Sequence, residues 1–146
     1  MRGVVTVTSN AKRVLQRATK EVNRAYGQHI YDTQSKFVRA NPKESGRMAS
    51  SWKTEEGSYT DWVRPESWNE GGTSPVVTVE WMIPTDANID EQWFLTNTVI
   101  YAHRLATDPK WSHGGEIGGT AWYTAIVNAN ARLLDEALQR AWNKIP

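Results

Sequence analysis

A long stretch with helical periodicity constrains the fold of this chain more than any other feature. Between residues 10 and 38, apolar or small residues recur at steps of three and four, the spacing of an amphipathic helix. A threonine, serine or asparagine at positions 8–10 can cap its start, and Asn41 ends it because Pro42 follows. If continuous, this helix is about 40 Å long, and Gly27 is the position where a bend or break is expected. We expect the chain after residue 41 to pack on its apolar face, which is formed by Ala11, Val14, Leu15, Ala18, Val22, Ala25, Tyr26 and Ile30.

The size and composition of the chain indicate one domain over residues 1–146 with a substantial core. The chain has no cysteine, which excludes a disulfide framework and a cysteine-ligated zinc site and agrees with assembly in a reducing cytoplasm. No run of about 18 apolar residues occurs, so we expect no membrane-spanning segment.

The net charge of +1 conceals a strong asymmetry along the chain. Residues 1–53 carry eleven Lys/Arg and three Asp/Glu, a net charge of +8, whereas residues 54–146 carry six and thirteen, a net charge of −7. Such a chain pairs with copies of itself or presents one sign to a polyanion, unless the two parts neutralise each other within one fold. Residues 55–91, with nine Asp/Glu against one arginine, are the candidate acidic side.

The basic residues of the first helix form one stripe on the side opposite its apolar face. The stripe is either an ordinary solvated face or a surface that meets an acidic subunit or DNA. We therefore identify it as a candidate interface, made of Arg13, Arg17, Lys20 and Arg24.

The rest of the chain contains strand signals and ends in a second helix. Residues 76–83 alternate in polarity, are β-branched and stop at a proline, so they are the clearest strand, with residues 92–98 as the expected antiparallel partner. Residues 121–143 show helical periodicity. This order predicts an α+β fold in which the N-terminal and C-terminal helices pack on one face of a small antiparallel β-sheet. The weaker predicted elements are a flexible arm or edge strand at 1–8, an irregular strand or strand pair at 51–63 broken at Gly57, an exposed loop at 64–75, a helical turn at 100–105 and a glycine-rich loop at 107–120.

Eight tryptophans in 146 residues is a high number. Tryptophan is a large core residue with a polar edge and is enriched at protein interfaces. Trp68 lies in the polar stretch 64–75, where it has no evident core role, and with Trp62 and Trp111 it is a candidate for a subunit or partner interface. The second hypothesis from this composition is a tryptophan-rich binding module for carbohydrate or nucleic acid, since exposed indole rings stack on sugars and bases.

The sequence contains little that indicates chemistry. His29 falls on the apolar side of the first helix, which predicts a packed or rim position. His103 and His113 have Asp108 and Glu116 nearby in the sequence, but no metal-binding spacing such as H-E-x-x-H accompanies them. The chain has no nucleophile elbow and no phosphate-binding glycine motif. We therefore predict no catalytic, cofactor-binding or metal-binding residues and no enzymatic activity.

Several short motifs follow one another in an informative order. The first helix leads through a proline into residues 45–48 (Ser-Gly-Arg-Met), followed by Ser-Trp at 51–52 and then strands. Asn97 precedes Tyr-Ala at 101–102, and a glycine-rich loop opens the final helix. This order resembles the phage head–tail joining family, also called neck or tail-completion proteins. The family pattern is a long helix, a proline, a Thr-Gly-x-Leu-x-x-Ser turn, strands, an Asn…Tyr-Ala segment, a Gly-Thr loop and a C-terminal helix.

The resemblance covers residues 10–142 and implies a fold shared with tail-terminator proteins. The matched residues are expected to have structural roles. Gly46 allows a positive φ in the turn between helix and sheet. Met48 and Trp52 are expected in the core, and Tyr101 is expected to pack with its hydroxyl toward the rim.

The function implied by the resemblance is that of a structural virion protein at the head–tail junction. Such a subunit forms a ring, most simply of six copies, through which DNA passes, and it is assembled in the host cytoplasm. Its implied partners are copies of itself, the adaptor and stopper proteins of the neck, the tail tube or terminator, and packaged DNA through non-specific contact. The chain departs from the family pattern at Ser45, Met48 and residues 105–106, which leaves open which neck protein it is.

Overall fold

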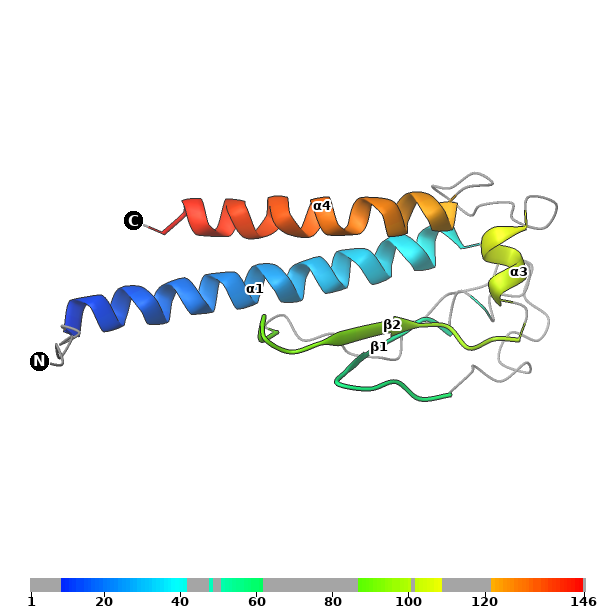
Figure 1. Ribbon diagram of the computed structural model, residues 1–146, viewed down its shortest axis with the longest axis horizontal. Coiled ribbons are helices and arrows are strands. Elements are labelled where there is room, and N and C mark those ends of the chain that lie inside the picture. The colour runs from blue at the N-terminus through cyan, green and yellow to red at the C-terminus, as the bar shows by residue number, and fades with distance from the viewer. Residues whose placement is uncertain are drawn as a thin grey trace, which may run out of the picture.

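The structure is a computed structural model in which two long helices run alongside a short β-sheet (Figure 1). The predicted α+β class, with a long N-terminal helix and a C-terminal helix packed with a small antiparallel sheet, is confirmed. The residues that the structure describes are 9–41, 48, 51–61, 87–100, 102–108 and 122–145.

The elements follow the order helix, strand, strand, short helix, helix. They are α1 (Ser9–Ala40), β1 (Lys53–Glu56), β2 (Trp93–Thr96), α3 (Ala102–Thr107) and α4 (Trp122–Asn143).

The helix α1 has 32 residues and organises the fold. It passes through Gly27 without interruption, because tertiary packing outweighs the penalty of about 1 kcal/mol for a glycine in a helix. Asn41 continues the last turn through its backbone N–H, which donates to the carbonyl of Phe37 at 3.0 Å. The helix ends there because Pro42 pushes the preceding residue out of helical geometry.

The strands β1 and β2 form an antiparallel pair in which Lys53 faces Thr96 and Glu56 faces Trp93. Gly57 ends β1 with a φ of 78°, a left-handed conformation that favours glycine, and its N–H donates to the carbonyl of Gln92 at 2.8 Å. The predicted break at Gly57 is therefore confirmed, and β2 lies within the predicted strand 92–98. The expected strand at 76–83 lies outside the described residues, and β1 is the partner that the structure shows for β2.

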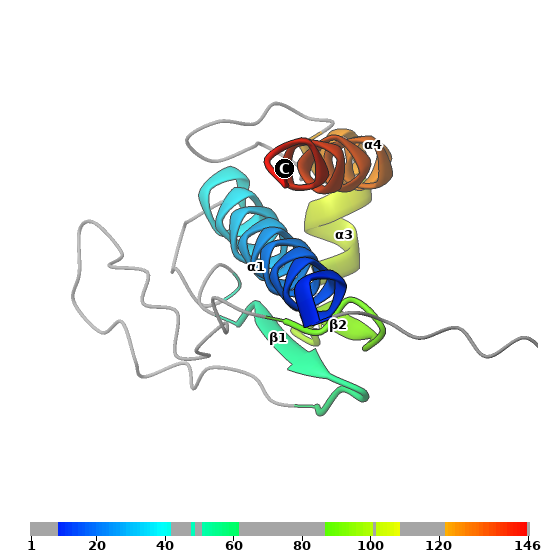
Figure 2. The same ribbon diagram turned by 90° about the vertical axis from the view of Figure 1, so that its left-hand side faces the viewer.

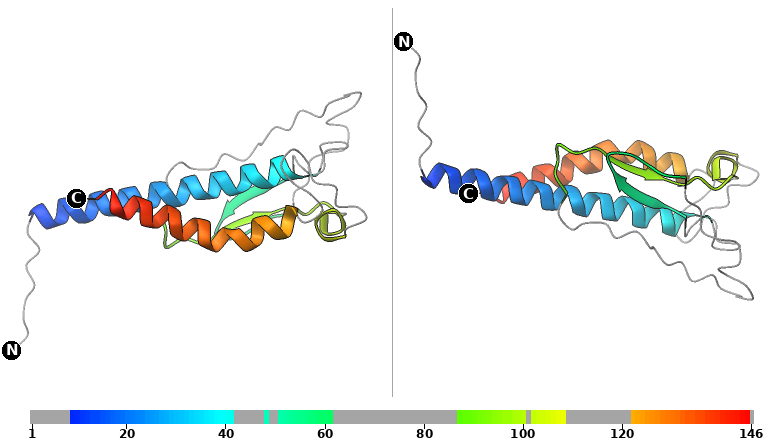
Figure 3. Two further views of the ribbon diagram at one scale, coloured as in Figure 1. Left: turned by 90° about the horizontal axis from the view of Figure 1, so that it is seen from above. Right: turned by 90° about the horizontal axis from the view of Figure 1, so that it is seen from below.

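Both long helices lie on the same side of the sheet, and in the end-on view α1 lies between α4 and the strands (Figure 2). α4 runs antiparallel to α1 along much of its length (Figures 1 and 3). A hydrogen-bonding contact joins the two helices, with His29 Nε2 2.9 Å from Asn130 Oδ1. α1 is tied to the sheet by the hydroxyl of Thr54, which donates to Gln34 Oε1.

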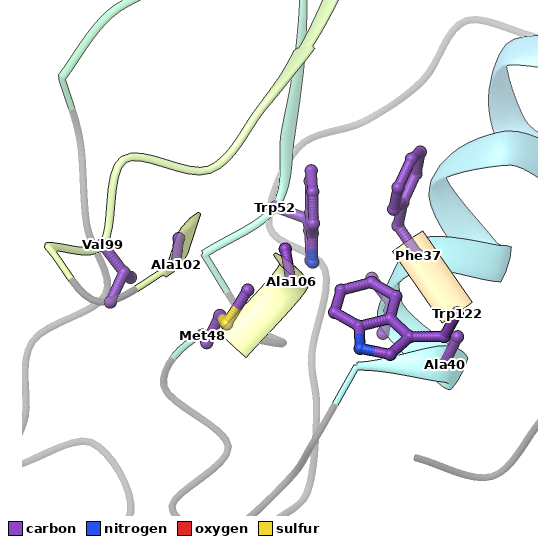
Figure 4. Close-up of a cluster of buried hydrophobic side chains, with 9 residues drawn as sticks. Phe37, Ala40, Met48, Trp52, Val99, Ala102, Ala106 and Trp122 are labelled. Atoms are coloured by element: carbon purple, nitrogen blue, oxygen red, sulfur yellow. The ribbon is translucent and has the colours of Figure 1, made fainter. Parts of the chain in front are cut away.

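The core lies where the C-terminal half of α1 meets the sheet, α3 and the start of α4 (Figure 4). Phe37 stacks on Trp52 with ring centroids 4.5 Å apart, and the ring of Trp122 meets Phe37 edge-on at 6.4 Å. Aromatic pairs in these geometries stabilise a core beyond their area of burial. The other buried members of this cluster are Val38, Ala40, Met48, Val99, Ala102 and Ala106.

The segment that carries the family resemblance is fixed by polar contacts at the edge of this core. Met48 and Trp52 are buried, as predicted. Asn97 uses both groups of its side-chain amide: Nδ2 donates to the Met48 carbonyl at 2.7 Å, and Oδ1 accepts from Val99 N at 3.3 Å. Only a side chain with both a donor and an acceptor can make these two bonds, which is why an asparagine suits this position. Gly46 and Tyr101, for which structural roles were also predicted, lie outside the described residues.

Candidate functional site

The basic stripe predicted on α1 is present as a continuous exposed surface. Arg24 makes one exposed ion pair within the helix, with Nη1 3.4 Å from Glu21 Oε1, and such a pair contributes little to stability. The stripe therefore leaves its charge available to a partner. Its members, all exposed, are Arg13, Arg17, Lys20 and Arg24.

The predicted acidic side is described at residues 55–61 and 87–91. Glu55 is engaged within the subunit: its carboxylate accepts from the backbone N–H and the hydroxyl of Thr60, both at 3.0 Å, and lies 3.9 Å from the fully buried ammonium of Lys53. The carboxylate of Glu55 therefore stabilises the fold, and the negative surface charge of this side comes from the other acidic residues. The exposed acidic residues are Glu56, Asp61, Asp90 and Glu91.

The N-terminal end of α1 projects past the C-terminal end of α4 (Figures 1 and 3). We call residues 10–17 the overhang; residues 12–17 are all exposed, and burial begins at Ala18. The side chains of Val14 and Leu15 are 49% and 60% exposed. The described residues that follow α1 pack on its apolar face, as predicted, but they leave the first turns of that face uncovered. The physical reason is length, since α1 has 32 residues and α4 has 22.

A second uncovered apolar surface is a groove between α4 and β2, floored by α1, which we call the α4–β2 groove. Its volume is about 320 Å³. One wall is formed by Val127 and Leu134 of α4, and the other by Trp93 and Leu95 of β2. Val127 is 46% exposed, so the groove is open to solvent. The indole N–H of Trp93 is buried and makes no hydrogen bond to the described residues.

The polar side chains along the floor of the groove are engaged in structural contacts. The imidazole Nε2 of His29, a buried residue, lies 2.9 Å from Asn130 Oδ1 and 3.4 Å from the hydroxyl of Thr33. Tyr26 donates its hydroxyl to the carbonyl of Glu91 at 3.1 Å, and burial raises the pKa of its phenol, so it stays a neutral donor. His29 is thus a packed residue, one of the two positions predicted for it.

The described tryptophans have different environments. Trp52 and Trp122 are in the core, whereas Trp142, near the end of α4, is 61% exposed and was not among the predicted contacts. The sequence did not indicate this exposure, because Trp142 belongs to the apolar stripe of the helix predicted at 121–143, where burial is expected. The predicted interface candidates Trp62, Trp68 and Trp111 lie outside the described residues.

Comparisons of the chain with protein-family models, with curated proteins and with solved structures give no significant match. None of the described helices combines the length and apolar character that crossing a bilayer requires. Among the described residues, no group of three or more His, Cys, Asp or Glu side chains is placed to hold a metal ion. The candidate sites that the described residues offer are three uncovered surfaces: the basic stripe, the overhang and the α4–β2 groove.

Proposed function

We propose that this protein is a structural subunit of the neck of a tailed phage, assembling into a ring at the head–tail junction through which DNA passes. One observation carries the proposal: α1 projects beyond its own subunit with basic and large apolar side chains uncovered. Contiguous apolar surface that a monomer leaves exposed marks a site of protein interaction. The sequence resemblance to head–tail joining proteins supplies the location of that assembly.

The charges of the described surfaces suit a head-to-tail contact. The basic stripe runs along the outer face of α1, and the exposed carboxylates of Asp90 and Glu91 lie at the start of β2. Two different surfaces that complement each other make a heterologous contact, which closes into a ring when the rotation between neighbours permits. In this proposal the ring contains six copies, and it contacts the adaptor, the stopper and the tail tube or terminator of the neck.

Side chains of the basic stripe that do not contact a neighbouring subunit have a second role in this proposal. Exposed arginine and lysine side chains bind phosphate without reading sequence, so the stripe would contact packaged DNA non-specifically. No catalytic step is part of the proposed function. The tryptophan-rich binding module has less support, because Trp52 and Trp122 are buried in the core.

The proposal is tested by native mass spectrometry and electron microscopy of the purified protein, and by locating it in purified virions. The variant Arg13→Glu/Arg17→Glu/Arg24→Glu is expected to remain folded, because all three side chains are exposed, and to lose ring closure. A matched control reverses three exposed cations of α4 and the residues just after it, changes the net charge equally, and is expected to form rings. Its substitutions are Arg132→Glu, Arg140→Glu and Lys144→Glu.

Normal rings from the α1 variant would refute the electrostatic part of the proposal. A protein that is monomeric in solution and also monomeric in the virion would refute the ring. A protein absent from the virion would refute the assignment to the neck.

A further inference from the structure

We infer that the α4–β2 groove of one copy receives the overhang of a second copy. The inference rests on the proposed function as a self-assembling subunit and names the two surfaces that meet. The anchors are Val14 and Leu15 on the overhang, and the receiving walls are Val127 with Leu134 on α4 and Trp93 on β2.

The overhang has the pattern of a helix that docks in a groove. Such helices bind through apolar anchors at positions i, i+3, i+4 and i+7. Here the spacing is met by Ala11, Val14, Leu15 and Ala18, and the last of these is already buried in its own subunit. The helix before Ala18 therefore offers Val14 and Leu15 as two large, exposed side chains on one face.

A second molecule is required because the overhang cannot reach the groove of its own subunit. The floor of the groove is formed by α1 itself, from Tyr26 to Phe37, and α1 is one uninterrupted helix from Ser9 to Ala40. The overhang is therefore a straight continuation of α1 that extends away from β2 and past the C-terminal end of α4 (Figure 3). The contact joins two different surfaces, as a ring-closing heterologous interface does.

Charge complementarity favours the same pairing. Asp135 is exposed on α4 and directly follows the wall residue Leu134 in the sequence, and Glu91 is exposed at the β2 side, where Tyr26 of the groove floor donates to its carbonyl. The arginine of α4 nearest to this rim in sequence, Arg132, is paired with Glu136 at 2.7 Å. Opposite charges at the rim steer two surfaces together and fix their register. The exposed cations that flank the apolar anchors of the overhang are Lys12, Arg13 and Arg17.

The absence of cysteine makes a direct test simple, because each single-cysteine variant carries one thiol. Leu15→Cys and Val127→Cys are made in chains of different size, mixed, assembled and treated with a short bifunctional maleimide. We expect a cross-linked product between the two different chains. The matched control replaces Leu15→Cys by Tyr31→Cys, another exposed position on α1 that lies on its outer face, and is expected to give little product.

Two further measurements complete the test. Val127→Cys is expected to react freely with a maleimide in dilute monomer and to be protected in the assembly. Leu15→Asp is expected to weaken self-association by about tenfold or more, since a charge would enter an apolar contact.

The outcomes separate this inference from the proposed function. Rings without the expected cross-link, cross-linking through Tyr31→Cys instead, or cross-linking of Leu15→Cys to itself would overturn the docking and leave the neck assignment standing. A Val127→Cys thiol already protected in the monomer would show that the chain fills its own groove, which also overturns it. A protein monomeric in solution and in the virion would overturn both.

Discussion

The hydrogen bond between Trp52 and Asn41 allows a quantitative test of how the end of α1 is fixed to the core. The indole Nε1 of Trp52 donates to Asn41 Oδ1 at 2.9 Å, and both residues are buried. In Asn41→Ala the indole N–H loses this acceptor in an environment from which water is excluded. A buried donor without a partner costs about 1–3 kcal/mol.

We therefore expect Asn41→Ala to lower the free energy of unfolding by about 2 kcal/mol. For a chain of this length, that loss lowers the melting temperature by about 4–8 °C. The measurement is urea unfolding followed by tryptophan fluorescence, with a thermal melt as a second probe. Asn143→Ala is the control, because this exposed asparagine near the end of α4 should change stability by no more than about 0.5 kcal/mol.

A double-mutant cycle with Trp52→Phe isolates the bond itself. Phenylalanine keeps an aromatic ring against Phe37 but has no N–H to donate. When both partners of a buried hydrogen bond are removed, the net cost of that bond is small, so Asn41→Ala should cost clearly less in the Trp52→Phe background than in the unmodified chain. An equal cost of Asn41→Ala in both backgrounds would refute the reasoning, because the two residues would then not be coupled.

Three further predictions concern stability, each measured by chemical denaturation. Gly57→Val should cost about 1–3 kcal/mol through backbone strain alone, because φ is 78° and a Cβ there would meet no atom of the described residues within 4 Å; an unchanged midpoint would contradict it. Asn130→Ala should cost about 1 kcal/mol by removing the contact to His29, and no loss would count against that contact. Phe37→Ala should cost about 3–5 kcal/mol, whereas Leu15→Ala in the monomer should stay within about 0.5 kcal/mol; similar losses would contradict the exposure of the overhang.

The helices could be predicted from the sequence because their signals are local. The period of apolar residues locates α1 and α4, and Pro42 fixes the end of α1 through the geometry of the residue before it. Gly57 was predicted as a break for a local reason as well, since glycine tolerates a positive φ. The basic stripe was predictable because charged side chains on one face of a helix remain exposed wherever packing uses the other face.

The pairing of the strands and the extent of burial could not be predicted in the same way. The sequence of β1 is short and irregular and carries no strong local strand signal. Its pairing with β2 is fixed by contacts between residues about 40 positions apart, which local patterns do not indicate. Burial of Lys53 beside Glu55 also depends on the tertiary fold. The exposure of Val14 and Leu15 could have been predicted from the sequence. The first predicted helix is longer than the second, so part of it must extend beyond the helix that packs against it.

The uncovered faces of α1 allow it to make two contacts at once. The basic stripe lies on the outer face, along with Tyr31, whereas the apolar face of the overhang continues the seam along which α4 packs. A contact through the apolar face, with Lys12, Arg13 and Arg17 at its rim, still leaves Lys20 and Arg24 for an acidic neighbour or for DNA. The two contacts differ in their response to salt, because screening of exposed charges is nearly complete at 1 M, where the Debye length is about 3 Å, while apolar burial persists. Assembly that survives high salt would thus depend on the overhang, and assembly lost at high salt would depend on the stripe.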